Sequence, residues 1–240
     1  PTYPSDQIAD TAPERRLRYV FDEGHHLFDA ADSGFSARIS GREMAELRRW
    51  IRGAEGRART RMRGVEERLK DLIADDEEAQ RKLEEAVDAA GALAGDGWAS
   101  RLANGAPRGP GEIFLAAAYG HVRARSDDRD AFYSLEAETQ PMNPELAQAV
   151  RHLSAALKRI AAPLGDLARH LRKTMNDKTA ELEPHTRGRL DAAARGLERR
   201  ARRVLPAWIA MLETLADGEI NEDFTDWFEI ARENGQDADV

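Results

Sequence analysis

The sequence predicts a mainly α-helical protein: an elongated antiparallel helical bundle or hairpin, inserted between short β segments of another domain. The second half of the chain carries two long apolar seams with the four–three spacing of packed helices. Aromatic residues make up only 6% of the 240 residues, which disfavours an all-β sandwich or barrel. Charged residues account for 33% and apolar residues for 41%, as in elongated helical proteins with a large surface for their volume.

Composition excludes several classes of site. The chain contains no cysteine, so it cannot form disulfides, thiolate zinc sites or cysteine-held iron–sulfur clusters by itself. The longest apolar run, residues 113–119, is far shorter than the roughly 20 residues of a membrane span, and we expect no membrane partner. The start, Pro1-Thr2-Tyr3-Pro4, lacks a signal-peptide pattern and an initiator Met, which suggests a processed chain or a fragment.

The first 34 residues differ from the rest. Residues 17–21, Leu-Arg-Tyr-Val-Phe, form a β-favouring run that ends in Asp22-Glu23 and predicts a buried strand delivering two acids at its carboxyl end. Residues 25–31 favour a helical turn or two, and Ser33-Gly34 ends it.

From Gly41 onward the apolar spacing is helical. The first helices are predicted from three groups of apolar residues: Met44, Leu47 and Ile51; Met62, Val65, Leu69 and Leu72; Leu83, Val87, Ala90 and Leu93. Residues 95–97 and 104–111 favour loops, residues 113–121 a short apolar helix, and residues 125–129 a polar break.

The second half predicts a helical hairpin. Its first seam is Leu146, Val150, Leu153, Leu157, Ile160, Leu164, Leu167 and Leu171; its second is Leu190, Ala194, Leu197, Ala201, Val204, Trp208, Met211 and Leu215. A polar turn around Glu183-Pro184 joins two helices of about 30 residues, or about 45 Å each. We expect kinks rather than breaks at Pro163 and Pro206, because the apolar phase is the same on both sides.

The last residues again favour β structure. Residues 224–230 are rich in aromatics, and Asn234-Gly235 is a hairpin-turn signal. We therefore divide the chain into 1–34, 35–222 and 223–240, a helical region between two strand-like segments. Because a lone strand is unstable, residues 17–22 and 224–230 should pair with each other, pair with another chain or be poorly ordered, and the two ends should lie close together.

The acids after the first strand form the motif that suggests chemistry. An apolar strand ending in Asp-Glu is the pattern of a Walker B element: Asp22 would hold Mg²⁺, Glu23 would orient or deprotonate the attacking water, and His25 would face the cleft. Two other interpretations remain open. The acids can simply be solvated, with His25 and His26 capping a helix start, or the histidines can bind a metal with Asp22, Glu23 and Asp29.

Residues 20–29, Val-Phe-Asp-Glu-Gly-His-His-Leu-Phe-Asp, resemble motif II of the DinG/XPD-like superfamily 2 DNA helicases. That motif is usually Asp-Glu-Ala-His followed by a short apolar helix, so the departure is Gly24 in place of Ala. In the family, a large helical insertion called the arch follows motif II, and the chain then returns to the motor domain. The order along this chain is similar over its whole length.

The resemblance implies an ATP-dependent DNA helicase, a DEAH-box enzyme such as those of DNA repair, that uses ATP and Mg²⁺ to separate strands 5′ to 3′. It implies single-stranded or forked DNA and the rest of the motor as partners, a bacterial cytoplasmic setting, and a possible 4Fe-4S cluster outside this chain. No phosphate-cradling Gly-x-x-x-x-Gly-Lys-Ser/Thr sequence is present. We therefore expect a helicase fragment that binds no ATP productively and is inactive alone.

Basic residues on the hairpin are candidate DNA contacts, since the overall net charge of −8 leaves local basic stretches intact. We predict a phosphate track for single-stranded DNA from six outward arginines: Arg159, Arg172, Arg195, Arg199, Arg202 and Arg203. The simpler alternative for any one of them is a solvated face. Trp50, Trp98 and Trp227 could stack on bases, whereas Trp208 lies on the seam and is expected in the core. The alternative function is a non-enzymatic helical structural or adaptor protein.

Overall fold

The computed structural model describes residues 24–27, 36–55, 63–126, 132–178, 182–218, 225–233 and 235–240. It divides the chain into two compact units, residues 1–36 and residues 37–240. In the first unit the described element is a short 3-10 helix, η1 (Gly24–His26). The other described helices and strands lie in the second unit, which we call the helical unit.

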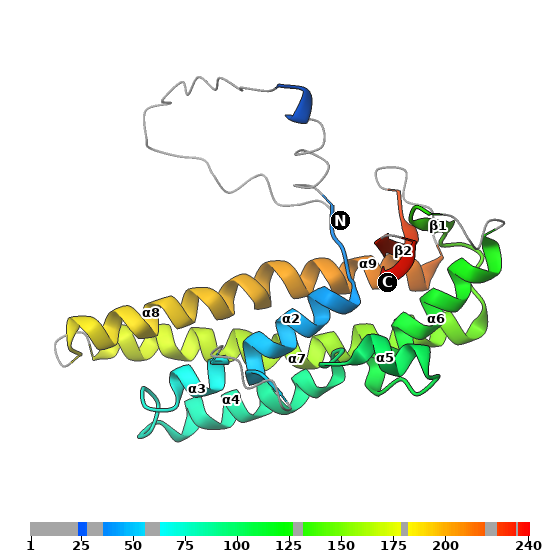
Figure 1. The fold of residues 1–240 in the computed structure, drawn as a ribbon. Coiled ribbons are helices and arrows are strands. Elements are labelled where there is room, and N and C mark those ends of the chain that lie inside the picture. Colours follow the sequence, from blue (N-terminus) through cyan, green and yellow to red (C-terminus); the bar gives the residue numbers. More distant parts are fainter. Residues whose placement is uncertain are drawn as a thin grey trace. The chain divides into compact units, whose positions relative to one another are not determined.

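The helical unit is mainly α with one small antiparallel sheet (Figure 1), which confirms the predicted fold class. Its elements are α2 (Gly41–Arg52), α3 (Val65–Leu69), α4 (Glu77–Ala89), η2 (Ala90–Ala92), α5 (Trp98–Ala103), α6 (Gly109–Arg125), β1 (Leu135–Glu138), α7 (Pro144–Asp177), α8 (Pro184–Arg199), η3 (Arg200–Val204), α9 (Leu205–Asp217), β2 (Trp227–Glu233) and β3 (Gln236–Asp239). Among the described residues, no helix has the length and apolarity needed to cross a membrane.

The long helix α7 is the central element of the unit. It packs against α8 and α9, which return along it as the predicted hairpin, and against α4 and α6 (Figure 1). The whole predicted seam of α7 is buried, including Leu153, Leu157 and Ile160. Burying each such side chain contributes roughly 1.5–3 kcal/mol, so this seam is a principal source of the unit's stability.

The two prolines of the hairpin are accommodated in different ways. Pro163 lies inside α7, which is continuous through it. Pro206 lies in the first turn of α9, and the five residues before that helix form a π-helical turn, η3, whose last bond joins the Leu205 N–H to the Arg200 carbonyl. Proline has no N–H with which to make the usual α-helical bond to the carbonyl four residues earlier. In the π-helical turn the bonds run to the carbonyl five residues earlier, so the helix passes Pro206 without that bond.

Past this turn Trp208 and Leu215 are buried as predicted, but Leu205 and Leu212 are buried in place of the predicted Val204 and Met211, which are half-buried. The expectation that the apolar phase is the same on both sides of Pro206 is therefore wrong, because the π-helical turn inserts one residue.

Three helices begin at polar capping residues. Ser40, Asp76 and Asn143 precede α2, α4 and α7, and each side chain accepts a hydrogen bond from the backbone N–H three residues on. Such caps satisfy N–H groups that the helix itself leaves without partners, and each contributes about 1 kcal/mol. The positions of these three polar residues in the sequence therefore determine where the helices begin.

Helix α6 is longer than expected. It begins at Gly109, within the predicted 104–111 loop, and runs to Arg125, whereas the apolar pattern predicted only residues 113–121. Pro110 lies in its first turn, where a proline's fixed φ and missing N–H fit a helix start. Proline here starts a helix rather than marking a loop. The short helix α5 was not expected from the sequence.

The C-terminal strand finds its partner inside the helical unit. The sheet order is β1-β2-β3, with Leu135 opposite Ile230 and Ala137 opposite Phe228, all four buried. For the described residues of 224–230, the expected pairing with residues 17–22 or with another chain is therefore wrong, because β1 is the partner. The run 17–22 and Phe224 lie outside the described residues. The expected hairpin turn joins β2 to β3, with Gly235 at φ 75°.

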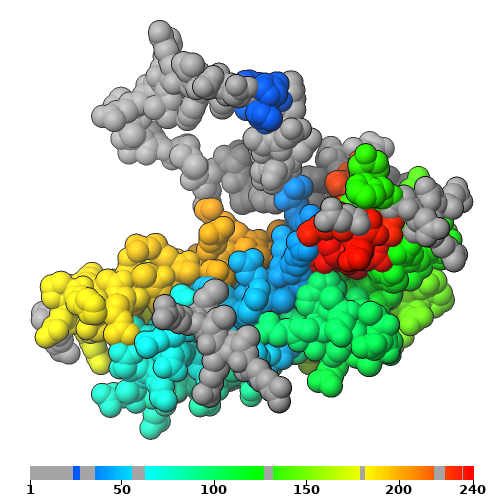
Figure 2. All heavy atoms as spheres, viewed as in Figure 1, coloured from blue at the N-terminus to red at the C-terminus, as the bar shows by residue number. Residues whose placement is uncertain are grey.

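The end of the sheet is hydrogen-bonded to the start of α2, the first helix of the unit. The Gly41 backbone N–H donates to the Val240 carbonyl at 3.1 Å, and the Arg42 N–H donates to Oδ1 of Asp239 at 3.2 Å. A carboxylate at a helix N-terminus is favourable because the helix dipole is positive there. Figure 2 shows the C-terminal strands (red) beside the start of α2 (blue) and against α6 (green). The first helix and the last strand of the unit thus lie together.

Candidate nucleic-acid interface

The predicted Walker B acids, Asp22 and Glu23, lie outside the described residues, as does Asp29. His25 is described: it lies in η1, is exposed, and its ring centroid is 4.0 Å from that of His26. Within the described ranges no group of three or more histidine, aspartate or glutamate side chains could hold a metal ion. The roles of the two acids and the alternative metal site therefore remain predictions.

The arginines of α8 and η3 form one exposed stripe. Arg195, Arg199, Arg202 and Arg203 are all exposed, and their spacing of four, three and one places them along one side of the helix. Arg195 forms an ion pair with Asp191, one turn earlier in the same helix. Among the residues that the structure describes, Arg199, Arg202 and Arg203 have no ion pair within 4 Å, so their charges face solvent. We call these three the α8 arginines, although Arg202 and Arg203 lie in η3, which continues α8.

Helix α7 carries a second set of exposed cations. Arg159 is exposed and has no ion pair with any described residue. Two neighbours are partly neutralised: Lys158 pairs with Glu213 of α9, and Arg169 pairs with Asp166. Arg159 is therefore better placed than Lys158 and Arg169 to bind a phosphate.

Arg172 differs from the prediction that it faces outward. Its Nε donates to Oε1 of Glu198 at 2.9 Å and its Nη2 to Oε2 at 2.7 Å, while its Nη1 reaches Asp191 at 3.4 Å. The side chain is 39% exposed and bridges α7 to α8. Glu198 accepts both bonds, and the hydrogen bond from Arg172 lowers the pKa of that carboxyl below its usual range. A guanidinium bound in this fork is a packing contact between the hairpin helices.

Replacing Arg172 by alanine should therefore affect stability rather than DNA binding. We expect a loss of about 0.5–1 kcal/mol in the free energy of unfolding, the upper range for partly exposed ion pairs. The matched variant Arg159→Ala should stay within about 0.5 kcal/mol of the parent, because Arg159 is exposed without an ion pair among the described residues. Urea unfolding followed by circular dichroism measures both. A weakened affinity for single-stranded DNA in Arg172→Ala, with stability unchanged, would contradict the packing role.

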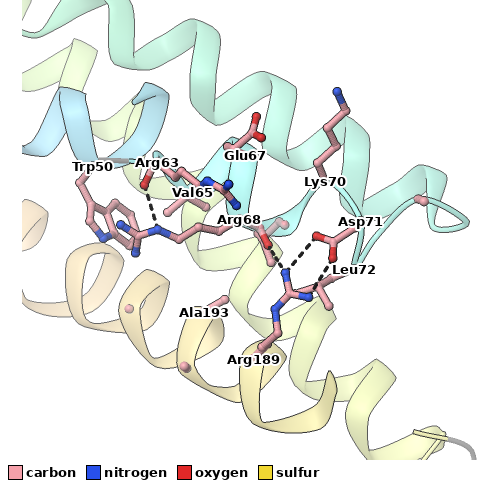
Figure 3. A pocket seen from close by; sticks show the side chains of 14 residues that line it. Trp50, Arg63, Val65, Glu67, Arg68, Lys70, Asp71, Leu72, Arg189 and Ala193 are labelled. Carbon is pink, nitrogen blue, oxygen red and sulfur yellow. Dashed lines mark hydrogen bonds and ion pairs between the residues drawn. The ribbon is translucent and has the colours of Figure 1, made fainter. Parts of the chain in front are cut away.

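A pocket of about 780 Å³ opens between α2, α3 and α8 (Figure 3). It is lined by Trp50, Arg63, Val65, Glu67, Arg68, Leu69, Lys70, Asp71, Leu72, Ala74, Arg189, Ala192, Ala193 and Gly196. Arg189 and Asp71 point toward each other and form two hydrogen bonds, at 2.8 and 3.0 Å. Arg68 donates from its Nε to the Arg63 carbonyl at 2.9 Å. Within the described residues, Arg63, Arg68 and Lys70 form no ion pair.

Trp50 and Arg200 stack at this pocket. The Arg200 guanidinium lies 3.6 Å from the centroid of the Trp50 ring, and its Nη1 donates to the Gly196 carbonyl at 3.2 Å. Burial is the main cause that lowers the pKa of Arg200 to about 10; the nearby charges of Arg199 and Arg68 act in the same direction, while Glu46 opposes them. Arg200 stays protonated at neutral pH. This pair was not foreseen, because no local pattern places a residue of α2 against one of η3.

No family model, curated protein or solved structure matches this chain. Exposed arginines on α8 and a basic pocket beside them suit the binding of phosphate groups, for which a planar guanidinium offers two parallel donors.

The remaining tryptophans divide as follows. Trp208 is buried in the hairpin seam, as expected. Trp98 is also buried, and it packs so closely on Gly41 that a Cβ there would lie 2.3 Å from its ring. Neither can stack on a base. Trp227 is exposed at the start of β2, so its base contact stays a prediction.

The buried titratable side chains of the unit are held in packing contacts. Glu112 is 1% exposed and accepts hydrogen bonds from Arg101 and from the backbone N–H groups of Gly95 and Arg108. His121, also buried, bonds the Glu138 carbonyl through Nε2 at 2.9 Å. Burial is the main cause that lowers the pKa of His121. Because their hydrogen bonds link neighbouring elements, these groups tie the helices together.

Proposed function

We propose that this chain supplies motif II and the arch-like helical insertion of an ATP-dependent DNA helicase. The observation that carries the proposal is the sequence of residues 20–29, an apolar run followed by Asp-Glu-Gly-His, directly before a long helical unit. In this scheme Asp22 holds the Mg²⁺ of ATP and Glu23 orients the attacking water. His25 is exposed in η1, and in this scheme it faces the cleft.

The geometry of the helical unit supports an insertion. A segment inserted into another domain must leave and return at nearby points, because the flanking strands belong to one sheet. Here the start of α2 and the end of β3 are joined by the bond from Gly41 to Val240 and by the Asp239 carboxylate at the helix N-terminus. Such a unit can be added to a motor domain without separating that domain's strands.

The role proposed for the helical unit is to guide the single strand. The α8 arginines and Arg159 are exposed cations without described ion pairs, which suits non-specific contact with a phosphate backbone. Arg172 is left out of this surface because its guanidinium is bound by Glu198, and Arg195 is weakened by its pair with Asp191.

The proposal places the rest of the catalytic machinery outside these 240 residues. They contain no phosphate-cradling loop with Lys-Ser or Lys-Thr, so ATP would be gripped by other parts of the motor, in the bacterial cytoplasm. A 4Fe-4S cluster, if the helicase has one, also requires cysteines from elsewhere.

Charge reversal of the α8 arginines tests the proposed DNA surface. Changing Arg199, Arg202 and Arg203 to glutamate should weaken binding of a single-stranded oligonucleotide at least about tenfold. It should also reduce the slope of log affinity against log salt by about 2, at about 0.7 per lost phosphate contact. Fluorescence anisotropy of a labelled oligonucleotide over a range of salt concentrations measures both quantities.

A second charge reversal controls for net charge. Arg81, Arg108 and Lys178 are also exposed, and changing them to glutamate alters the net charge equally, away from the stripe. This control should keep most of the affinity. If both triple variants bind alike, or if the parent chain does not bind single-stranded DNA, the helical unit does not guide the strand and the adaptor interpretation takes its place.

A further inference from the structure

The pocket between α2, α3 and α8 has an excess of positive charge. Arg189 is matched by Asp71, but Arg63, Arg68 and Lys70 line the same pocket without an ion pair among the described residues. Besides Asp71, which pairs with Arg189, the pocket is lined by one other described carboxylate, that of Glu67. The unmatched cations make the pocket a favourable place for an anion.

A half-buried arginine lies next to this pocket. Arg200 stacks on Trp50, a pocket residue, and sits close enough to Arg68 and Arg199 for their charges to disfavour its protonated form. Gly196 allows this arrangement, because a Cβ at that position would lie 3.1 Å from the Trp50 ring. Bringing like charges together costs free energy, and an anion bound between them would offset that cost.

We propose that this pocket binds a phosphate group of single-stranded nucleic acid, through Arg68 beside Trp50, with the neighbouring charge of Arg200 adding to the attraction. The proposal rests on the proposed function, because it is the strand guided by the α8 arginines that would reach the pocket. Arg199 and Arg200 are consecutive residues, so the exposed stripe leads directly to the half-buried guanidinium. The pocket therefore adds a phosphate contact beside the stripe.

The size and chemistry of the pocket agree with such a ligand. Its volume of about 780 Å³ lies within the roughly 300–1,000 Å³ of sites that hold small ligands, so one phosphate with part of its nucleotide can enter. Guanidinium groups bind phosphate through two parallel N–H donors. Free phosphate has the same chemistry, but it would gain nothing from the adjoining stripe, which favours the strand as its source.

The test uses the full chain and an unstructured single-stranded oligonucleotide. Arg68→Gln removes an exposed cation whose only described side-chain bond goes to the Arg63 carbonyl, so folding should be unaffected. We expect the affinity for the oligonucleotide to fall about threefold to tenfold and the salt slope to fall by about 0.7. The matched variant Arg81→Gln, an exposed arginine of α4, should change neither quantity.

Tryptophan fluorescence provides an independent readout of the pocket. A saturating oligonucleotide should change the emission of the parent chain, and the change should become smaller in Trp50→Phe. Inorganic phosphate alone should reproduce it only at far higher concentration.

The possible failures can be told apart. If the parent chain does not bind the oligonucleotide, both the proposed function and this inference are wrong. If it binds, and the α8 triple reversal weakens it, but Arg68→Gln behaves like Arg81→Gln, then only the phosphate pocket is wrong. If inorganic phosphate saturates the Trp50 signal while the oligonucleotide leaves it unchanged, the pocket binds free phosphate and not the strand.

Discussion

Replacing Glu112 by alanine should lower the free energy of unfolding of the helical unit by about 1–3 kcal/mol, the cost of leaving buried hydrogen-bond donors without their acceptor. Glu112 is 1% exposed, and Arg101 binds both of its oxygens, at 2.8 Å from Nε and 2.5 Å from Nη2. The backbone N–H groups of Gly95 and Arg108 donate to the same carboxylate. The substitution leaves all of these donors without their acceptor, and urea unfolding measures the loss.

The effect should depend on pH in a defined direction. Burial alone would raise the pKa of Glu112, but the bonds from Arg101, Arg108 and Gly95 outweigh it and hold the pKa below its usual value. A carboxyl with a lowered pKa in the folded state stabilises the protein above its unfolded pKa of about 4.3, and this contribution is lost as the pH falls through the folded pKa. The difference between the parent and Glu112→Ala should therefore be largest at neutral pH and shrink in acid.

Two variants control the interpretation. Glu85→Ala removes a carboxylate from an exposed ion pair with Arg81 and should cost less than about 1 kcal/mol. The double variant Arg101→Ala with Glu112→Ala should lose clearly less free energy of unfolding than the sum of the two single losses. The reason is that each single variant leaves the other charged group without its partner. A cost for Glu112→Ala as small as that of Glu85→Ala would show that the buried carboxylate does not hold α6 to its neighbours.

The hairpin could be predicted from the sequence and the sheet could not, for a physical reason. The seam from Leu146 to Leu171 repeats the same apolar spacing over seven turns, so one misplaced residue would not hide it. The strand β1 has four residues, Leu-Glu-Ala-Glu, whose alternation is too short to stand out. Its partner was recognised as a strand, but the pairing is a contact between residues about 90 positions apart, and no local pattern specifies it.

The candidate surface could be predicted only in part. The α8 arginines were found because helical spacing places them opposite the buried seam, and they are exposed. The same reasoning failed for Arg172, since it considered one helix at a time and could not see Glu198 on the facing helix. The stacking of Arg200 on Trp50 depends on the packing of α2 against the hairpin. The π-helical turn before Pro206 has no simple sequence signal. It changes which residues after it face the core, so the helical spacing alone could not predict them.

Changing Glu23 to glutamine in the complete helicase should lower ATP hydrolysis by at least about 100-fold, the usual contribution of a residue that positions or deprotonates the attacking nucleophile. Binding of ATP should remain close to that of the parent, because the amide has the same shape as the carboxylate and Asp22 still holds Mg²⁺. Steady-state phosphate release measures hydrolysis, and a fluorescent nucleotide measures binding.

The matched change is Asp29→Asn, which also neutralises an acid close to motif II but lies outside the Asp-Glu-Gly-His segment. It should leave hydrolysis near the parent rate. The 240-residue chain alone should show no ATPase above background, since phosphoryl transfer depends on positioning and charge neutralisation by a phosphate grip that this chain lacks. If Glu23→Gln hydrolyses ATP at the normal rate, residues 22–25 are not a Walker B element, and the basic hairpin then has to be explained as a surface of an adaptor protein.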